Sequence, residues 1–141
     1  MNGNNHTING NGRAALFSTS AKYLEINDLT IKNCVGHVIY VSDSNLVLNN
    51  VRFITDSTDF EDENMEFNGI YAWYSSININ NSLFCGNNND EYSAIAAMSD
   101  NVLNIENTQF IDLNSTYDSA ITIFDSSVTV KSSSFKNTMQ T

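Results

Sequence analysis

The sequence predicts an all-β protein, folded as a right-handed parallel β-helix of about five coils with three short strands in each coil. The main observation is that inward-facing residues recur at offsets 0, 2, 5 and 7 from an anchor. The anchors are Leu24, Leu46, Ile77, Leu103 and Val128. Their spacings of 22, 31, 26 and 25 residues are typical of a solenoid repeat. No helical period runs through the chain.

Residues 24–41 show one coil most clearly. Residues two apart lie on the same face of a strand. Residues 24–26, 29–31 and 39–41 therefore each predict a short strand whose first and last side chains face inward. In later coils the third strand is expected to have two inward-facing residues, the second of them five residues before the next anchor. These pairs are Ile70/Ala72, Ala96/Met98 and Ile121/Ile123.

A polar pair separates the first two strands of every coil. Its second member is Asp28, Asn50, Asn81, Asn107 or Ser132. Asn and Asp tolerate left-handed backbone, so the pair predicts a sharp bend. With coils stacked ~4.8 Å apart, these side chains are expected to form a ladder in which each amide bonds the residue one coil away. The right hand is inferred from the dominant hand of parallel crossovers.

The last offset of the pattern is aromatic in four coils. These residues are Phe53, Phe84, Phe110 and Phe135. Because they share one column, we expect their rings to stack in the interior, where aromatic side chains bury a large apolar area.

Composition limits the function classes. The net charge is −10 and the six basic residues are scattered, which argues against a nucleic-acid partner. No apolar run approaches the ~20 residues of a membrane span, so no membrane insertion is expected in this segment.

Residues 1–141 are interpreted as one domain, a segment of a longer repeat protein. Open coil edges at both ends then favour edge-to-edge self-association.

Two cysteines, Cys34 and Cys85, fall in coils that are not adjacent. Two coil rises separate them by at least ~9 Å, which is beyond the reach of a disulfide. We therefore predict two free thiols.

A candidate ligand platform follows from the strand at residues 70–73. Tyr71 and Trp73 alternate with inward residues, so they face outward, and Tyr40 shares the column of Tyr71 one coil earlier. Tyr74 follows directly, and Phe124 shares the column of Trp73 two coils later. Outward aromatic rings with a polar handle can stack on sugar rings.

The longest insertion, residues 55–68, precedes this strand and carries six carboxylates. It is interpreted either as a solvated acidic loop or as a cation site, since carboxylates are hard oxygen ligands. The insertion also contains the apolar residues Phe60, Met65 and Phe67. As an alternative to a ligand platform, the insertion is therefore expected to fold back and cover the aromatic rings.

Three further carboxylates, Asp43, Asp100 and Asp125, are expected to share one column at another bend. Asp100 and Asp125 would be neighbours there. Either each caps its own turn through a backbone bond, or the two share a calcium ion and form a weak metal site. No other cofactor is expected.

Residues 2–12, NGNNHTINGNG, are similar to the first coil of the pectin-lyase-like, carbohydrate-associated β-helix superfamily. The chain is most similar to adhesin-like surface proteins of methanogenic archaea. It also resembles polymorphic outer-membrane proteins, whose units pair a Gly-Gly-Ile-type segment with Phe-x-x-Asn. The corresponding segments here are Asn68-Gly69-Ile70, Ser93-Ala94-Ile95, Ser119-Ala120-Ile121 and Phe84-Cys85-Gly86-Asn87.

This resemblance implies an extracellular or cell-surface location and a role in attachment or presentation, with glycans or another cell's surface as partner. For an enzyme of the superfamily, it would imply a calcium-binding carboxylate cluster beside an Arg or Lys base, or paired Asp residues flanking a glycosidic bond. Neither constellation is visible, since Arg13 and Arg52 lie outside the Asp column. We therefore expect a non-enzymatic, adhesin-like segment. The alternative is a fragment of a polysaccharide lyase or glycoside hydrolase.

Overall fold

The computed structural model describes residues 1–13, 17–20, 22–34, 36–55, 69–86, 93–113 and 119–138. Every regular element in these ranges is a β-strand. The strands are β1 Asn2–Arg13, β2 Phe17–Thr19, β3 Tyr23–Cys34, β4 Ile39–Ser42, β5 Asn45–Ile54, β6 Ile70–Trp73, β7 Ser76–Asn80, β8 Leu83–Cys85, β9 Ile95–Met98, β10 Val102–Glu106, β11 Gln109–Ile111, β12 Ile121–Phe124, β13 Ser127–Lys131 and β14 Ser134–Lys136. Within the described part of the chain, no helix is long and apolar enough to cross a membrane.

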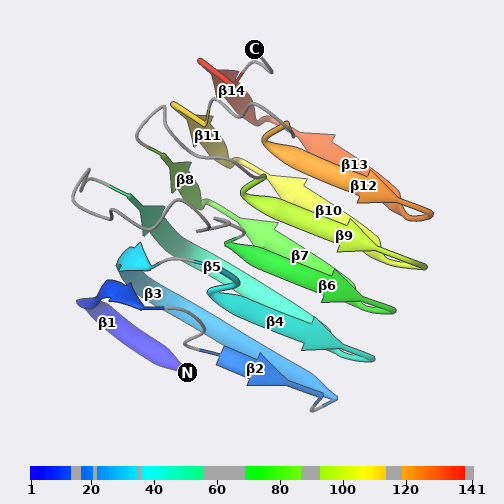
Figure 1. Cartoon of the computed structure of the whole chain (residues 1–141), viewed down its shortest axis with the longest axis horizontal. Helices are drawn as coiled ribbons and strands as arrows, with labels where there is room; N and C mark the ends of the chain where they lie inside the picture. Colours follow the sequence, from blue (N-terminus) through cyan, green and yellow to red (C-terminus); the bar gives the residue numbers. More distant parts are fainter. Residues whose placement is uncertain are drawn as a thin grey trace.

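All the strand pairs are parallel, and they form three stacks around one core (Figure 1). One stack is the sheet β12-β9-β6-β4-β2. The other two, β7-β10-β13 and β8-β11-β14, join into a single sheet because both begin on the long strand β5, which pairs in turn with β3. The chain is therefore the all-β parallel β-helix that the sequence predicts, with two of its three stacks continuous at β3 and β5.

The predicted phase of the first two strands is confirmed by their register. The anchors pair in one unbroken column, Leu24, Leu46, Ile77, Leu103 and Val128. The aromatic column is equally regular. Its successive rings are 4.7, 5.1 and 4.7 Å apart, and their planes agree within 5°. Phe53, Phe84 and Phe110 are at most 1% exposed, so this column fills the interior.

The prediction for the third strand is wrong in one coil. Ile95, rather than Ala96, pairs with Ile70. Ile95 and Ala97 therefore face the core and are 0% exposed, whereas Ala96 and Met98 lie on the outer side of the sheet. The cause is one additional residue in the bend that follows. Three residues connect β9 to β10, where two connect β6 to β7.

Every predicted bend residue between the first two strands has left-handed backbone. The φ values of Asp28, Asn50, Asn81, Asn107 and Ser132 lie between 48° and 53°. The predicted side-chain ladder forms partly in this column and partly in the column of the residues that directly precede these bend residues. Asn50 Nδ2 donates to Asp28 Oδ1 at 2.8 Å. In the preceding column, Asn49 donates to Asn27 at 2.8 Å and Asn80 donates to Asn49 at 3.0 Å.

A second ladder runs inside the coil at the bend that leads from the third strand to the next anchor. The backbone N–H of Ser44 donates to Ser75 Oγ at 3.2 Å, that of Ser75 to Asn101 Oδ1 at 2.9 Å, and that of Asn101 to Ser126 Oγ at 3.0 Å. Ser44, Ser75 and Asn101 are at most 5% exposed. These side chains thus supply acceptors for backbone donors that the strand ladder leaves unpaired at the bend.

A third ladder has the same chemistry at the bend between the first two strands. The N–H of Val51 donates to Ser82 Oγ at 3.1 Å, that of Ser82 to Thr108 Oγ1 at 3.4 Å, and that of Thr108 to Ser133 Oγ at 3.0 Å. Each hydroxyl also donates to the carbonyl two residues before it. Both internal ladders tie each coil to the next.

The two cysteines are free, as predicted. Cys34 is 2% exposed, and burial raises the pKa of its thiol. Cys85 is half-buried at the end of β8. Because the thiolate is the reactive form, an Ellman's reagent assay at pH 8 should modify Cys85 in the native protein and reach Cys34 only after unfolding. The variant Cys85→Ser should then show no native thiol. Equal rates at both sites would contradict this burial.

Candidate functional site

Aromatic side chains gather on the outer side of the sheet β12-β9-β6-β4-β2. In β6 the burial alternates strictly, with Ile70 and Ala72 inside and Tyr71 and Trp73 outside. In β4 the same alternation turns Tyr40 outward. Tyr74 follows β6 with a φ of 47° and is 53% exposed. We call Tyr40, Tyr71, Trp73 and Tyr74 the aromatic face.

These four rings form a connected strip. Tyr40 and Tyr71 are register partners on adjacent strands, and their rings stack with centroids 6.0 Å apart and planes 13° apart. Tyr71 is 6.0 Å from Trp73, and Trp73 is 6.3 Å from Tyr74, both tilted. Such distances and angles are typical of interacting aromatic pairs. The rings therefore hold one another in place and present a preformed surface.

Met98, His37 and Ala96, which sequence reasoning did not assign to this surface, extend it together with Phe124. Met98 pairs with Trp73 on one side and with Phe124 on the other, so Trp73, Met98 and Phe124 form one outer column. Phe124, which the sequence placed in the column of Trp73, is 64% exposed. The ring of His37, in the segment before β4, lies 4.3 Å from that of Tyr71. Ala96 pairs with Tyr71 on the same outer side of the sheet.

Tyr40, Tyr71 and Trp73 are half-buried. The predicted acidic insertion lies outside the described residues, except for Thr55. The same is true of its carboxylates and of Phe60, Met65 and Phe67. Whether the insertion covers the aromatic face, or binds a cation, stays a prediction.

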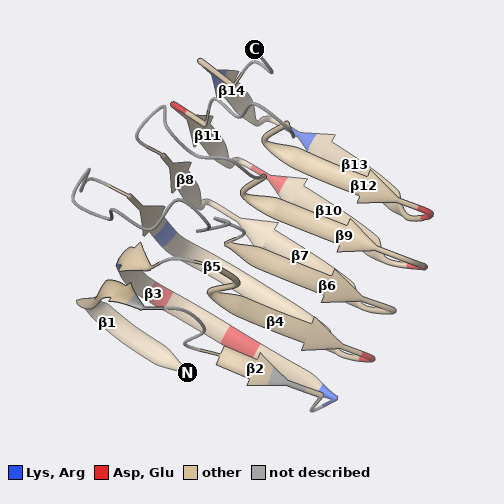
Figure 2. Ribbon diagram, viewed as in Figure 1, with Lys and Arg blue, Asp and Glu red and all other residues tan. Residues whose placement is uncertain are grey.

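Acidic residues lie at the bends beside this face, as Figure 2 shows for the ends of β4, β9 and β12. Trp73 and Phe124 both pair with Met98, and continuing this register by one residue places Ser99 in the column of Tyr74 and Asp125. Asp100 is thus one residue past its predicted column, again because of the additional bend residue. It still adjoins Asp125, since its N–H donates to the Asp125 carbonyl at 2.6 Å.

The weak calcium site predicted at Asp100 and Asp125 therefore has two exposed carboxylates on neighbouring bends. Among the residues that the structure describes, no group of three or more His, Cys, Asp or Glu side chains is arranged to hold a metal ion. Calcium binding here stays a prediction. The side chain of Asp43 accepts a hydrogen bond from Ser42 Oγ at 2.9 Å, so this carboxylate is engaged at its own turn.

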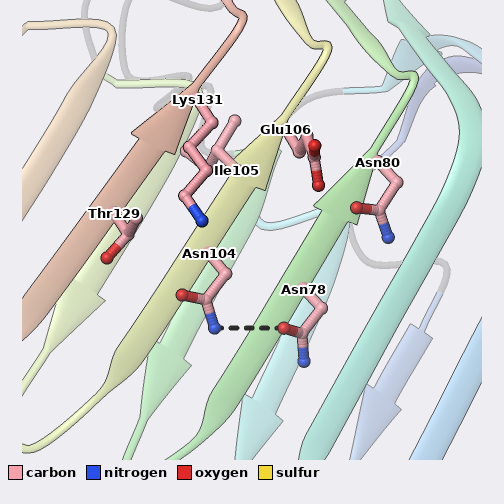
Figure 3. A pocket seen from close by; sticks show the side chains of 7 residues that line it. All are labelled: Asn78, Asn80, Asn104, Ile105, Glu106, Thr129 and Lys131. Carbon is pink, nitrogen blue, oxygen red and sulfur yellow. Dashed lines mark hydrogen bonds between the residues drawn. The ribbon is translucent and has the colours of Figure 1, made fainter.

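A second, polar surface feature lies on the stack β7-β10-β13 (Figure 3). It is a shallow hollow of about 170 Å³, lined by Asn78, Asn80, Asn104, Ile105, Glu106, Thr129 and Lys131. Asn104 Nδ2 donates to Asn78 Oδ1 at 3.1 Å across two strands. Glu106 and Lys131 are register partners at its rim. Sequence reasoning did not predict this hollow, because its lining comes from strands of three separate coils.

The described residues form a parallel β-solenoid with an outward aromatic strip. Comparison with protein-family models, curated proteins and solved structures found no match. The aromatic face and the polar hollow are therefore the features of the chain that bear on its function.

Proposed function

We propose that this chain is a non-enzymatic, adhesin-like β-helix segment that acts at the cell surface or outside the cell and attaches to carbohydrate through the aromatic face. The observation that carries the proposal is the strip of four contacting rings on and beside the outer side of a parallel sheet. Rings with hydroxyl or N–H groups at their edges combine apolar stacking with hydrogen bonding. The resemblance to pectin-lyase-like adhesins belongs to the same proposal.

The ligand chemistry follows from geometry and charge. The rings of Tyr40 and Tyr71 are nearly parallel and 6.0 Å apart, and the tilted rings of Trp73 and Tyr74 continue the strip, which suits a glycan chain that lies along the strip and makes apolar contacts with it. The bends beside them carry Asp43, Asp100 and Asp125. A net charge of −10 disfavours polyanions. Neutral polysaccharides are therefore the preferred class.

A glycan array together with a turnover assay on polyuronates tests this function. We expect binding to neutral glycans and no bond cleavage. Tyr71→Ala should weaken binding by at least about 5-fold, because an aromatic contact contributes about 1 kcal/mol beyond its buried area. Tyr23→Ala is the matched control, since Tyr23 is 57% exposed on β3, away from the aromatic face. Equal binding by wild type and Tyr71→Ala would exclude the aromatic face as the site.

The alternative function, a fragment of a polysaccharide lyase or hydrolase, is favoured by one observation. Glu106 and Lys131 bring a carboxyl and an amino group onto neighbouring strands that line the polar hollow, and enzymes use side chains of these two types in general acid–base catalysis. Turnover of any polysaccharide that is lost in both Glu106→Gln and Lys131→Met would favour this second function over the first.

A further inference from the structure

The aromatic face lies in a strongly negative part of the chain. Strands β4, β6, β9 and β12 and the bends that follow them contain no Lys or Arg. Their three charged residues are Asp43, Asp100 and Asp125, all of them exposed at the bends (Figure 2). Lys22 lies at the corresponding bend one coil before Asp43. Residues 35–118 as a whole hold thirteen acidic residues and one basic residue.

The carboxylate of Asp43 lies beside the outer column of Trp73. Ser42 and Trp73 are register partners, so Ser42 stands on the outer side of the sheet one coil before the indole. Ser42 Oγ donates to Asp43 Oδ2 at 2.9 Å, which holds the carboxylate on this side. The N–H of Asp43 also donates to the carbonyl of Trp73 at 3.1 Å.

The exposed ring of Tyr74 stands between acidic bends. Asp43 and Tyr74 take the same place on successive coils, with left-handed φ of 51° and 47°. Towards the next coil, the N–H of Tyr74 donates to the carbonyl of Ser99 at 3.0 Å, and Asp100 follows directly. Tyr74 is 53% exposed, and its ring is 6.3 Å from that of Trp73. Two aromatic rings and two carboxylates therefore meet at the bend end of the aromatic face.

This combination suits a positively charged group. The face of an aromatic ring attracts a cation, and the negative surroundings raise the local concentration of cations. A carboxylate accepts several hydrogen bonds, so the bond from Ser42 leaves Asp43 able to accept another from an ammonium group. The same charge that disfavours polyanions therefore favours a sugar that carries an amino group over its uncharged counterpart.

We propose that the bend end of the aromatic face is a subsite for the protonated amino group of an amino-sugar polysaccharide. Its residues are Trp73, Tyr74, Asp43 and Asp100. The inference rests on the proposed function and refines its ligand. The sugar rings stack along the aromatic face, and the amino group adds a contact that a neutral chain does not make.

Isothermal titration calorimetry with glucosamine oligomers and N-acetylglucosamine oligomers of equal length tests this subsite. Both are measured in one buffer at about pH 5.5, where a primary amine of this kind is protonated. Because His37 lies against Tyr71, a common buffer keeps its charge equal in both titrations. The amino form should bind at least about 5-fold more tightly at low salt. The preference should shrink at about 0.5 M salt, which screens exposed charges.

The double variant Asp43→Asn/Asp100→Asn should lose most of this preference and keep its affinity for the N-acetylated form. Asn tolerates the left-handed backbone of both positions, and circular dichroism checks that the variant is folded. Asp28→Asn is the matched control. It removes a carboxylate from another left-handed bend residue, with a φ of 52° on β3, and the preference should persist.

Four results would overturn the subsite. If the N-acetylated form binds and the amino form binds no more tightly, the inference fails while the proposed function stands. If neither form binds, the inference fails, and the glycan array decides the proposed function separately. A preference that survives in the folded double variant would place the amino group elsewhere. Equally tight binding of a poly-lysine peptide with the same number of charges would show a surface for cations in general, without selection for sugar.

Discussion

Phe84→Ala is expected to lower the free energy of unfolding by about 3–5 kcal/mol, as other deletions of a buried aromatic ring do. Phe84 is 0% exposed and stacks on Phe53 at 4.7 Å and on Phe110 at 5.1 Å. Its removal leaves a void in the middle of the aromatic column. Strand β8 is paired with β5 and β11 on its two sides, and backbone pairing fixes the spacing of the coils, so they cannot close this void by moving together.

Urea denaturation of Phe84→Ala and Phe135→Ala measures this effect with a matched control. Phe135 stands in the same column but is 47% exposed in the last coil. Its truncation should cost about 1 kcal/mol, because nearly half of its surface is already in contact with water. Similar losses in the two variants would contradict the assigned coil phase.

Asn101→Ala is expected to cost about 2–4 kcal/mol, because it leaves several buried polar groups without partners. Asn101 is 2% exposed at the bend with the additional residue. Its Nδ2 donates to the carbonyls of Met98 at 2.8 Å and Ser99 at 3.1 Å. Its Oδ1 accepts the N–H of Ser75 at 2.9 Å. One side chain thus stabilises its own bend and the coil before it.

The matched control is Asn104→Ala, three residues later. Asn104 is exposed and makes a single side-chain bond to Asn78. Its truncation should change the free energy of unfolding by about 0.5 kcal/mol or less, as for most surface substitutions. Equal losses at Asn101 and Asn104 in thermal denaturation would mean that the internal ladder does not support the bend.

Most of the fold could be predicted because the core residues repeat with a rigid spacing within each coil. In every coil the anchor and the inward residue at offset 7 are separated by the same number of residues, so the segment between them never varies in length. The bend after the third strand does vary. Ser99 and Asp100 both take left-handed φ, of 60° and 51°, and counting back from Leu103 therefore gave the wrong residues. The Ala94-Ile95 segment, aligned with Gly69-Ile70, agrees with the observed phase, although the spacing from Leu103 was used to predict it.

The internal ladders were not predicted, for a physical reason. Ser82, Thr108 and Ser133 occupy an interior offset where the first two coils have Leu29 and Val51. In the sequence, these three polar residues look like imperfect matches to a position of the repeat that is expected to be apolar. Their role depends on a backbone N–H that belongs to the neighbouring coil, and this becomes evident only when the coils are stacked.

The aromatic face was predictable where strand alternation alone decides orientation, as at Tyr40, Tyr71 and Trp73. Met98 was missed through the same one-residue slip. His37 was missed because it lies between strands, where no periodicity indicates the direction of a side chain.

Trp73 fluorescence tests the central claim most directly, since Trp73 is the single tryptophan of the chain and lies in the middle of the aromatic face. Titration with a neutral polysaccharide that the array identifies should shift its emission to the blue and protect it from iodide quenching, and both changes should saturate together. Tyr71→Ala should weaken the response, while Tyr23→Ala should preserve it. A glycan that binds with unchanged Trp73 emission and unchanged quenching would contradict the assignment of the aromatic face as the attachment site.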